Sequence, residues 1–258
     1  MTQKKAKQLT LPYGNGKLGD FLSYLNLPYI AQNHEQTADL AAKEQWTYSK
    51  YLYALIEAET IQRQDRATKR RVSQARFPVL KTMDEFVWSW PKKVNRLQIQ
   101  GLFQLNFINN KANVIFLGGV GLGKTHLATA LAYHACLQGA SVLFATAIDV
   151  INSLAAAQQA GRFQQELKKY LKPALLVLDE LGYLPIDKVG ADLLFQVISH
   201  RYERGSMLIS TNRAFKDWPE IFNNDATLTS AILDRLLHHA ETVIIEGKSY
   251  RMKDVVET

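Results

Sequence analysis

Cysteine is almost absent from this chain: Cys136 is the only one among 258 residues, so no disulfide can form within the chain. Long apolar runs are also missing, because no stretch approaches the roughly 20 residues that span a bilayer. The basic start, Met-Thr-Gln-Lys-Lys-Ala-Lys, leads into no apolar segment of the kind that a signal peptide needs. These absences predict a protein without a disulfide scaffold or a membrane partner, and they favour a cytoplasmic location.

Acidic residues are in the minority. The chain has 31 Lys and Arg against 24 Asp and Glu, which gives a net charge of +7 at pH 7 and an isoelectric point near 9.3. Such an excess indicates a polyanionic partner such as nucleic acid, although basicity alone also describes many proteins with no such partner. The hydrophobic content of 47% argues against a disordered chain, and the length suits one α/β domain of ordinary size plus an appendage.

The most informative stretch is a glycine loop between a predicted strand and a predicted helix. The run Asn113-Val-Ile-Phe-Leu enters the loop, and a helix-forming run from His126 leaves it. The loop fits G-x-x-x-x-G-K-[ST], in which successive N–H groups and the helix N-terminus converge on phosphate. We therefore predict a nucleotide site, in which Lys124 reaches the β- and γ-phosphates and the Thr125 hydroxyl holds Mg²⁺. The expected nucleotide contacts are Gly118, Gly119, Val120, Gly121, Leu122, Gly123, Lys124, Thr125 and His126.

A second chemical signal is an apolar run that ends in two acids, Ala174-Leu-Leu-Val-Leu-Asp179-Glu180. Ligands of parallel sheets lie at the carboxyl ends of the strands, so Asp179 is expected to reach the Mg²⁺ shell through water. Glu180 is expected to polarise the water that attacks the γ-phosphate. An acidic strand end is common by itself, but after a phosphate loop the Asp-Glu pair favours an ATPase, with Thr125 and Asp179 at the metal.

A polar strand end supplies one more candidate. The run Ser206-Met-Leu-Ile-Ser210 predicts a strand that ends in Thr211-Asn212-Arg213. If this strand lies between the loop strand and the Asp179 strand, Asn212 lies between the acids and the γ-phosphate. We therefore predict that Asn212 senses the γ-phosphate; the alternative is an ordinary turn asparagine.

The N-terminal part is predicted to be helical. Residues 1–20 are expected to form a flexible leader, residues 21–80 a helical domain and residues 81–258 the ATPase domain. The last third of a long helix expected over about 43–74 carries many positive charges and little negative charge. These charges form either a solvated face or contacts with the DNA backbone, and we favour DNA in a basic nucleotide-binding protein. The candidates are Arg63, Arg66, Lys69, Arg70, Arg71 and Arg76.

The remaining elements follow from hydrophobic periodicity and from Gly and Pro. The expected helices cover about 21–27, ending near Pro28, then 33–42, 43–74, 95–107, 126–136, 147–160, 161–171, 187–204 and 227–240. The expected strands cover about 113–117, 141–146, 174–180, 206–210 and 241–246. This alternation predicts an α/β fold with a five-stranded sheet.

The glycine loop is a Walker A motif, and the apolar run that ends in Asp179 and Glu180 is a Walker B pattern. Together with the polar strand end, they resemble the AAA+ ATPases. Over about residues 21–252 the chain is similar more narrowly to the DnaC/IstB group, and within it to the IstB-type ATP-binding helper proteins of insertion sequences. The stretches that carry this resemblance are Leu25-Asn-Leu-Pro28, Glu59 to Arg71, Ala75 to Thr82, Gly118 to Leu127, Leu178-Asp-Glu-Leu-Gly-Tyr183, Ser210-Thr-Asn212 and Gly247-Lys-Ser-Tyr-Arg251.

The resemblance implies the sheet order 5-1-4-3-2 and a protein that assembles on duplex DNA with ATP and stimulates a separate transposase. It implies a homo-oligomer with ATP between subunits, in which a neighbour supplies an arginine to the γ-phosphate; Arg235 is the matching position, or else an exposed helix arginine. It also implies that the helix pair before Asp179 faces DNA, which adds Lys168 and Lys169 as candidates. An isolated subunit is then expected to hydrolyse ATP slowly.

The chain departs from the AAA+ plan after the fifth strand. Twelve residues leave no room for a full helical lid, so the lid is expected to be absent or minimal, and no sensor role is assigned to Arg251. The paired His238 and His239 are not at metal-ligand spacing with any Cys or acid cluster, so we interpret them as surface or helix-end residues.

Two other functions compete with the transposition helper. A DnaC-type replicative helicase loader would have a nearly identical core, and a neighbouring transposase gene would separate the two. A small-molecule P-loop kinase would need an acceptor pocket and arginines in a lid over the phosphates, and its activity should be indifferent to DNA.

Overall fold

A computed structural model of the 258-residue chain describes residues 17–252. The chain divides into two compact units, residues 1–67 and 68–258, and the division falls within the long helix α3 (Tyr48–Ala75). The sequence placed a boundary later, between residues 80 and 81, and the assignment of functions to these domains stays a prediction. Most of the predicted leader, residues 1–16, lies outside the described residues, and helix α1 already begins at Leu18.

The first unit contains α1 (Leu18–Tyr24), α2 (Pro28–Lys43) and the first part of α3. Pro28 is the first residue of α2, not the end of α1, because proline has no N–H to lose at a helix start. The small core contains Leu22, Ile30 and Leu55. Helix α3 begins at Tyr48, later than the predicted Lys43; the Thr47 hydroxyl accepts from the Lys50 N–H there.

A buried carboxylate connects two of these helices. Glu59, on α3, is 3% exposed and accepts from the N–H groups of Tyr29 and Ile30 at 2.8 and 3.2 Å. These donors belong to the first turn of α2, where N–H groups have no helical partner and negative charge is favoured. Arg66 Nη2 pairs with the other Glu59 oxygen at 3.0 Å. The charged groups of the first unit therefore also serve its packing.

The second unit is built on a five-stranded parallel sheet with the order β2-β3-β4-β1-β5. This order is the predicted 5-1-4-3-2 counted from the other edge, so the predicted sheet is confirmed. Because β4 pairs with both β1 and β3, the carboxyl ends of these three strands lie side by side. The strands are β1 (Asn113–Gly118), β2 (Val142–Thr146), β3 (Leu175–Leu181), β4 (Ser206–Thr211) and β5 (Ala240–Ile245).

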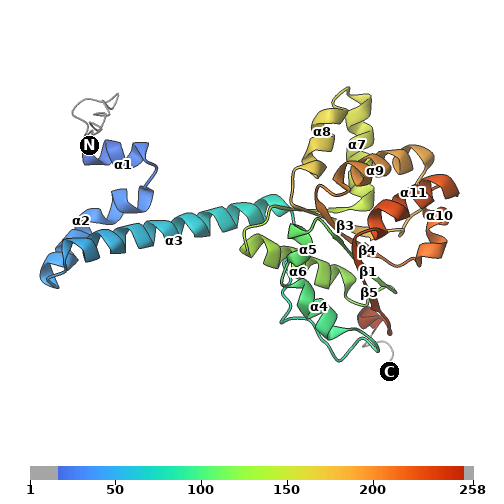
Figure 1. Ribbon diagram of the computed structural model, residues 1–258, viewed down its shortest axis with the longest axis horizontal. Helices are drawn as coiled ribbons and strands as arrows, with labels where there is room; N and C mark the ends of the chain where they lie inside the picture. The colour runs from blue at the N-terminus through green and yellow to red at the C-terminus, as the bar shows by residue number, and fades with distance from the viewer. Residues whose placement is uncertain (1–16, 253–258) are drawn as a thin grey trace, which may run out of the picture. The chain divides into compact units, whose positions relative to one another are not determined.

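Helices cover both faces of this sheet (Figure 1). One face carries α4 (Arg96–Leu102), α5 (Asn106–Asn109) and α6 (Lys124–Leu137), and its core contains Phe116 and Leu131. The other carries α7 (Ala147–Gln159), α8 (Phe163–Leu171), α9 (Lys188–Arg201), α10 (Trp218–Ile221) and α11 (Ala226–Leu237). Two short 3₁₀ turns complete the described part, η1 (Phe215–Asp217) and η2 (Tyr250–Met252).

Two local features differ from the predicted elements. The helix expected over 95–107 is interrupted, because Leu105 has a left-handed backbone with φ 59° that no α-helix continues through. Helix α10 was not predicted. After β5 the described residues contain only the turn η2, in agreement with the predicted minimal lid. Among helices within residues 17–252, none has the length and apolar content that crossing a bilayer requires.

Candidate nucleotide-binding site

A cavity of about 700 Å³ opens at the carboxyl ends of the strands in the second unit. Its wall combines the glycine loop, the ends of β3 and β4, the connector before α4 and the turn η2. Ligands of open parallel sheets bind at this edge. The residues on which the argument below depends are Phe86, Trp90, Gly121, Lys124, Thr125, His126, Glu180, Tyr183, Ser210, Asn212, Tyr250 and Arg251.

The glycine loop presents its backbone to the cavity from Val120 through His126. Gly121 and Gly123 have φ of 73° and 86°, and Gly123 is the N-cap of α6, so the loop curls immediately before a helix N-terminus. The predicted contacts Gly118 and Gly119 do not line the cavity. Gly118 is small for another reason, because a Cβ there would meet the Ile245 carbonyl oxygen of β5.

The Lys124 ammonium group lies within this loop. Its Nζ donates to the Gly119 carbonyl oxygen at 2.7 Å. Burial lowers the pKa of Lys124, the positive charge of Arg251 lowers it further, and Asp179 and Glu180 oppose both effects. An anion that binds beside a partly desolvated lysine and a second cation favours the charged form of that lysine, and a triphosphate is such an anion.

Asp179 is 3% exposed and accepts hydrogen bonds from two hydroxyl groups. Thr125 Oγ1 lies 3.0 Å from Asp179 Oδ2, and Ser210 Oγ donates to Oδ1. A carboxylate beside a threonine hydroxyl is the hard oxygen donor set that Mg²⁺ prefers, so the residues fit the predicted metal. The two residues predicted to hold Mg²⁺, Thr125 and Asp179, are thus in contact, and their metal role stays a prediction. Ser210 was not among the predicted site residues.

Glu180 and Asn212 both line the cavity. Glu180 is exposed and has φ 59°, a left-handed conformation that is uncommon for a residue other than glycine. Asn212 follows β4, which lies between β1 and β3 as the prediction for this residue required. The structure thus brings Lys124, Glu180 and Asn212 to one cavity, and their individual roles stay predictions.

The connector between α3 and α4 is the largest part of the wall that the sequence did not reveal. The ring Nε2 of His126 lies 2.8 Å from the Thr82 carbonyl oxygen, and the same ring packs edge-on against Phe86. A Cβ on Gly123 would come within 2.6 Å of the Phe86 ring, so the loop and the connector approach each other closely. The signal in the sequence is the aromatic run Phe86-Val-Trp-Ser-Trp-Pro, which joins two helical parts without forming a strand or helix itself.

The C-terminal turn closes the cavity from a further side. The Tyr250 N–H donates to the Gly121 carbonyl oxygen at 2.9 Å, and Trp90 Nε1–H donates to the Lys248 carbonyl oxygen at 2.9 Å. The Trp90 and Tyr250 rings meet edge-on with centroids 5.3 Å apart. Arg251 lines the cavity beside them. The Gly247 to Arg251 motif therefore holds the turn η2 against the phosphate loop.

Arg235 is the predicted catalytic residue that the structure does not bring to this cavity. It lies on α11, where its Nη1 donates to the Ala231 carbonyl oxygen at 2.8 Å and its guanidinium stands over the Phe195 ring at 5.0 Å. It is not among the lining residues. The catalytic role of Arg235 stays a prediction.

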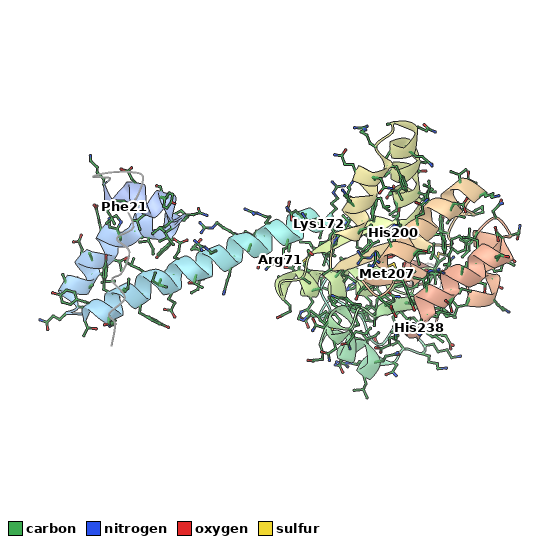
Figure 2. All side chains as sticks on the ribbon, turned by 45° about the horizontal axis from the view of Figure 1, so that its top comes forward. Phe21, Arg71, Lys172, His200, Met207 and His238 are labelled. Carbon is green, nitrogen blue, oxygen red and sulfur yellow. The ribbon has the colours of Figure 1, made fainter. Side chains whose placement is uncertain are left out.

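The predicted DNA contacts divide into engaged and exposed side chains. Arg66 pairs with Glu59, and Lys169 Nζ pairs with Glu166 at 2.8 Å. Arg71 (Figure 2) donates from Nε to the Cys136 carbonyl oxygen at 2.9 Å, where it compensates the C-terminal end of α6. The exposed members are Arg63, Lys69, Arg70, Arg76 and Lys168, of which Arg63 also donates to the Asn26 carbonyl oxygen at 2.7 Å.

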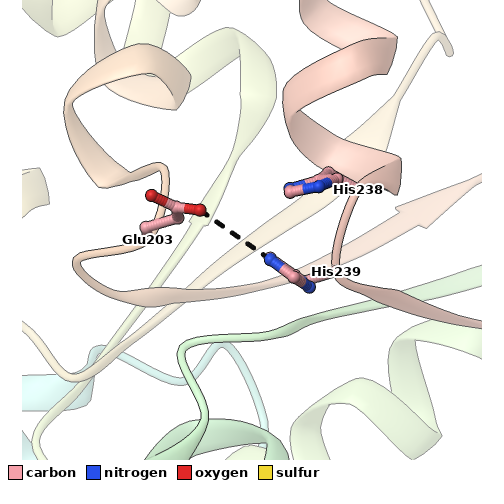
Figure 3. A group of neighbouring side chains, drawn as sticks. All are labelled: Glu203, His238 and His239. Carbon is pink, nitrogen blue, oxygen red and sulfur yellow. Dashed lines mark ion pairs between the residues drawn. The ribbon is translucent and has the colours of Figure 1, made fainter.

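The paired histidines have an acidic neighbour that their spacing in the sequence conceals. Glu203 lies beside His238 and His239, and its Oε1 is 3.8 Å from His239 Nε2 (Figure 3). One ligand atom from each residue can be chosen within 4.8 Å of the others, but all three side chains are exposed. His238 Nδ1 lies 2.8 Å from the Tyr202 hydroxyl. Glu203 and His239 form a surface ion pair that connects the end of α11 to the turn before β4.

Comparisons with known proteins agree with this architecture. The model of the family described as IstB-like ATP binding protein matches residues 21–258. The chain is 37% identical over 238 residues to the insertion sequence IS5376 ATP-binding protein of Geobacillus stearothermophilus, covering 92% of this chain and 94% of the relative. It is 38% identical over 233 residues to the insertion sequence IS21 ATP-binding protein of Pseudomonas aeruginosa, covering 90% and 88%.

Solved structures share the fold of the second unit. The DnaC helicase loader gives a TM-score of 0.53 at 22% identity, over 64% of this chain and 96% of that chain. The replication initiator DnaA bound to AMPPCP and single-stranded DNA gives a TM-score of 0.54 at 22% identity. That match covers 68% of this chain and 53% of the initiator, so the chain spans about half of the initiator's length. At these identities the likeness shows a common fold alone.

Proposed function

Because the chain belongs to the family of IstB-like ATP binding proteins, we propose that it is an ATP-dependent, DNA-binding helper of transposition that hydrolyses ATP within an oligomer. The observation that carries the proposal is the cavity lined by the glycine loop, Glu180 and Asn212. Asp179 lies next to this cavity, where it accepts from the hydroxyl groups of Thr125 and Ser210. Its relatives are named as ATP-binding proteins of insertion sequences, which supports the biological setting.

The chemistry follows from the side chains around the cavity. The loop N–H groups and Lys124 bind the triphosphate, and Thr125 and Asp179 are the residues that would hold Mg²⁺, whose charge offsets that of the phosphate oxygens. A water oxygen forms a bond to the γ-phosphorus while the bond to the bridging oxygen breaks, which leaves ADP. Glu180 accepts the proton of that water, and the Asn212 amide orients the γ-phosphate.

Arg235 supplies positive charge to the site of a neighbouring copy. Its position on α11, outside the lining of the chain's own cavity, supports this assignment. A charge-neutralising arginine is worth about three to five orders of magnitude in phosphoryl transfer. Hydrolysis is therefore slow in isolated subunits and fast in the assembled form.

Mixing two inactive variants tests this arrangement directly. Lys124→Ala removes the loop cation and Arg235→Ala removes the arginine, so each variant alone should lose hydrolysis. In a head-to-tail assembly of equal amounts, about a quarter of the interfaces combine an intact loop with an intact arginine. ATPase activity should return to about that fraction of the wild-type rate, whereas no recovery in verified mixed oligomers would refute hydrolysis between subunits.

Duplex DNA is the proposed polyanion. Exposed basic side chains on α3 and α8, with the net charge of +7, support contacts with the DNA backbone that do not depend on base sequence. Affinity measured by fluorescence anisotropy should require ATP and fall steeply with salt. Affinity that survives high salt would contradict backbone recognition.

The transposase partner is the most specific part of the proposal. If a transposase is encoded beside this chain, its strand transfer should increase when the helper and ATP are added, and it should not increase with Lys124→Ala. The helicase-loader alternative draws on fold likeness only. It would be favoured if the chain bound a replicative helicase and left the transposase unaffected.

A further inference from the structure

A buried serine on β4 connects the two acids of the candidate site. Ser210 is 1% exposed, and its hydroxyl donates to Asp179 Oδ1. The same oxygen accepts from the Glu180 N–H at 3.1 Å. A hydroxyl has one hydrogen and two lone pairs, so the hydrogen is committed to the carboxylate and a lone pair to the amide.

The pairing of β3 with β4 explains why a side chain is needed here. The register runs regularly to Leu178 opposite Ile209 and resumes with Leu181 opposite Thr211. Asp179 and Glu180 therefore share the single position opposite Ser210, which makes a bulge in a parallel pair. A bulge leaves a backbone N–H without its ladder partner, and an unpaired buried N–H is costly. The Ser210 oxygen takes the place of that partner.

The bulge also sets the backbone at Glu180. Its φ of 59° costs energy for a residue with a side chain, so the surrounding contacts must maintain it. The hydrogen bond from the Glu180 N–H to Ser210 is a contact of this kind. Without it, the bulge can relax toward the ordinary ladder and turn the Glu180 side chain away from the cavity.

The two hydroxyl partners of Asp179 differ in whether they can keep their hydrogen bond to this carboxylate when nucleotide binds. Thr125 belongs to the phosphate loop, and P-loop proteins direct this hydroxyl toward the metal when nucleotide is bound. Ser210 belongs to β4, a buried strand of the sheet, and not to the phosphate loop. The Ser210 bond is therefore the one that can hold the Asp179 carboxylate in place whether or not nucleotide is present.

We propose that Ser210 is a positioning residue that orients both acids, the Asp179 carboxylate through its hydrogen and the Glu180 backbone through its lone pair. The proposal rests on the proposed ATP hydrolysis for its kinetic consequence, whereas its structural consequence does not. Partners that orient metal ligands change metal affinity or activity by about 10- to 100-fold when they are removed.

The chain contains a matched control on the same strand. Ser206 is 0% exposed and its hydroxyl also donates a hydrogen bond, at 3.0 Å to the Phe107 carbonyl oxygen. It lies at the opposite end of β4 from the cavity. Ser206→Ala and Ser210→Ala thus each remove one buried hydroxyl from β4, but only the second removes a contact with the acids.

The experiment compares three readouts in the full-length wild type and both variants. For Ser210→Ala we expect the Mg²⁺ concentration that half-saturates binding of a fluorescent ATP analogue to rise about tenfold or more. We also expect kcat to fall more than KM changes, and amide exchange to become faster in the peptide that contains Glu180. Ser206→Ala should match the wild type in all three readouts.

Two outcomes would overturn the role of Ser210: an unchanged Mg²⁺ midpoint and unchanged Glu180 exchange in Ser210→Ala, or an equal change in Ser206→Ala. Absence of ATP hydrolysis by the wild type would instead reject the proposed function. In that case the Mg²⁺ midpoint and the amide exchange still decide whether Ser210 orients the acids, so the two failures are distinguishable.

Discussion

Replacement of Arg201, on α9, should strongly destabilise the second unit. This side chain is 1% exposed and its guanidinium makes five hydrogen bonds to backbone carbonyl oxygens. Two acceptors, on Tyr170 and Leu171, belong to the C-terminal end of α8, where a positive charge offsets the helix dipole. Two further acceptors, on Pro173 and Ala174, lie directly before β3, and the fifth is on Ser206, the first residue of β4.

The magnitude follows from two opposing effects. Burial lowers the pKa of Arg201 to about 10, which corresponds to a desolvation cost of about 3 kcal/mol that the substitution would relieve. Arg201→Met keeps the apolar stem but leaves several buried carbonyl oxygens without a donor, at about 1–3 kcal/mol each. We therefore expect a net loss of about 3–5 kcal/mol, as is typical when a buried charge network loses one partner.

Urea unfolding monitored by far-UV circular dichroism measures this loss. Arg204→Met is the matched control, because Arg204 is exposed in the turn that follows α9. The Arg201 variant should unfold at a clearly lower urea concentration, while the control should lie within about 0.5 kcal/mol of the wild type. Equal stability of the two variants would refute the idea that this guanidinium holds the starts of β3 and β4 together.

Three further predictions concern the site and the DNA contacts. Glu180→Gln should leave ATP bound but slow its hydrolysis at least about a hundredfold, as measured by nucleotide binding and phosphate release. Burial raises the pKa of Cys136 to about 11, so its thiolate fraction at pH 8 is about 0.1%, and Ellman's reagent should label it only after unfolding. Changing Lys69 and Arg70 to Ala should weaken duplex binding and its salt dependence, whereas Arg71→Ala should lower stability and leave the salt dependence unchanged.

Strands β1 to β4 could be predicted from sequence because each is a short, mostly buried apolar run bounded by Gly, Pro or a polar end, whereas β5 is partly exposed and includes Glu241. Val114, Leu176 and Leu208 are 0% exposed, so nothing competes with their packing. The glycine loop was predictable because its glycine spacing is the one that lets backbone N–H groups surround a phosphate. The two acids were predictable because they end an apolar strand. Asn212 needed one further condition, the place of β4 in the sheet, and the structure meets it.

The parts that could not be predicted depend on contacts between distant segments. Ser210 meets the acids only because the β3–β4 register shifts after Leu178, and no local pattern reports such a shift. Glu203 lies beside the paired histidines only because the end of α11 packs near the turn before β4. Pro28 was interpreted as a helix end, although the same residue type is equally suited to a helix start.

The described residues after β5 bear on the proposed assembly. Within the described residues, η2 is the only element after β5, and it closes the cavity by binding the Gly121 carbonyl oxygen. In the chain's own cavity, the positive charge that can face a bound triphosphate includes that of Lys124 and Arg251. The repulsion between these two charges contributes to the lowered pKa of Lys124. A bound triphosphate would offset that repulsion, and Arg235 of the same chain is not among the residues that line the cavity. We propose that the missing charge is supplied by a neighbouring copy, so that nucleotide binding and assembly each favour the other.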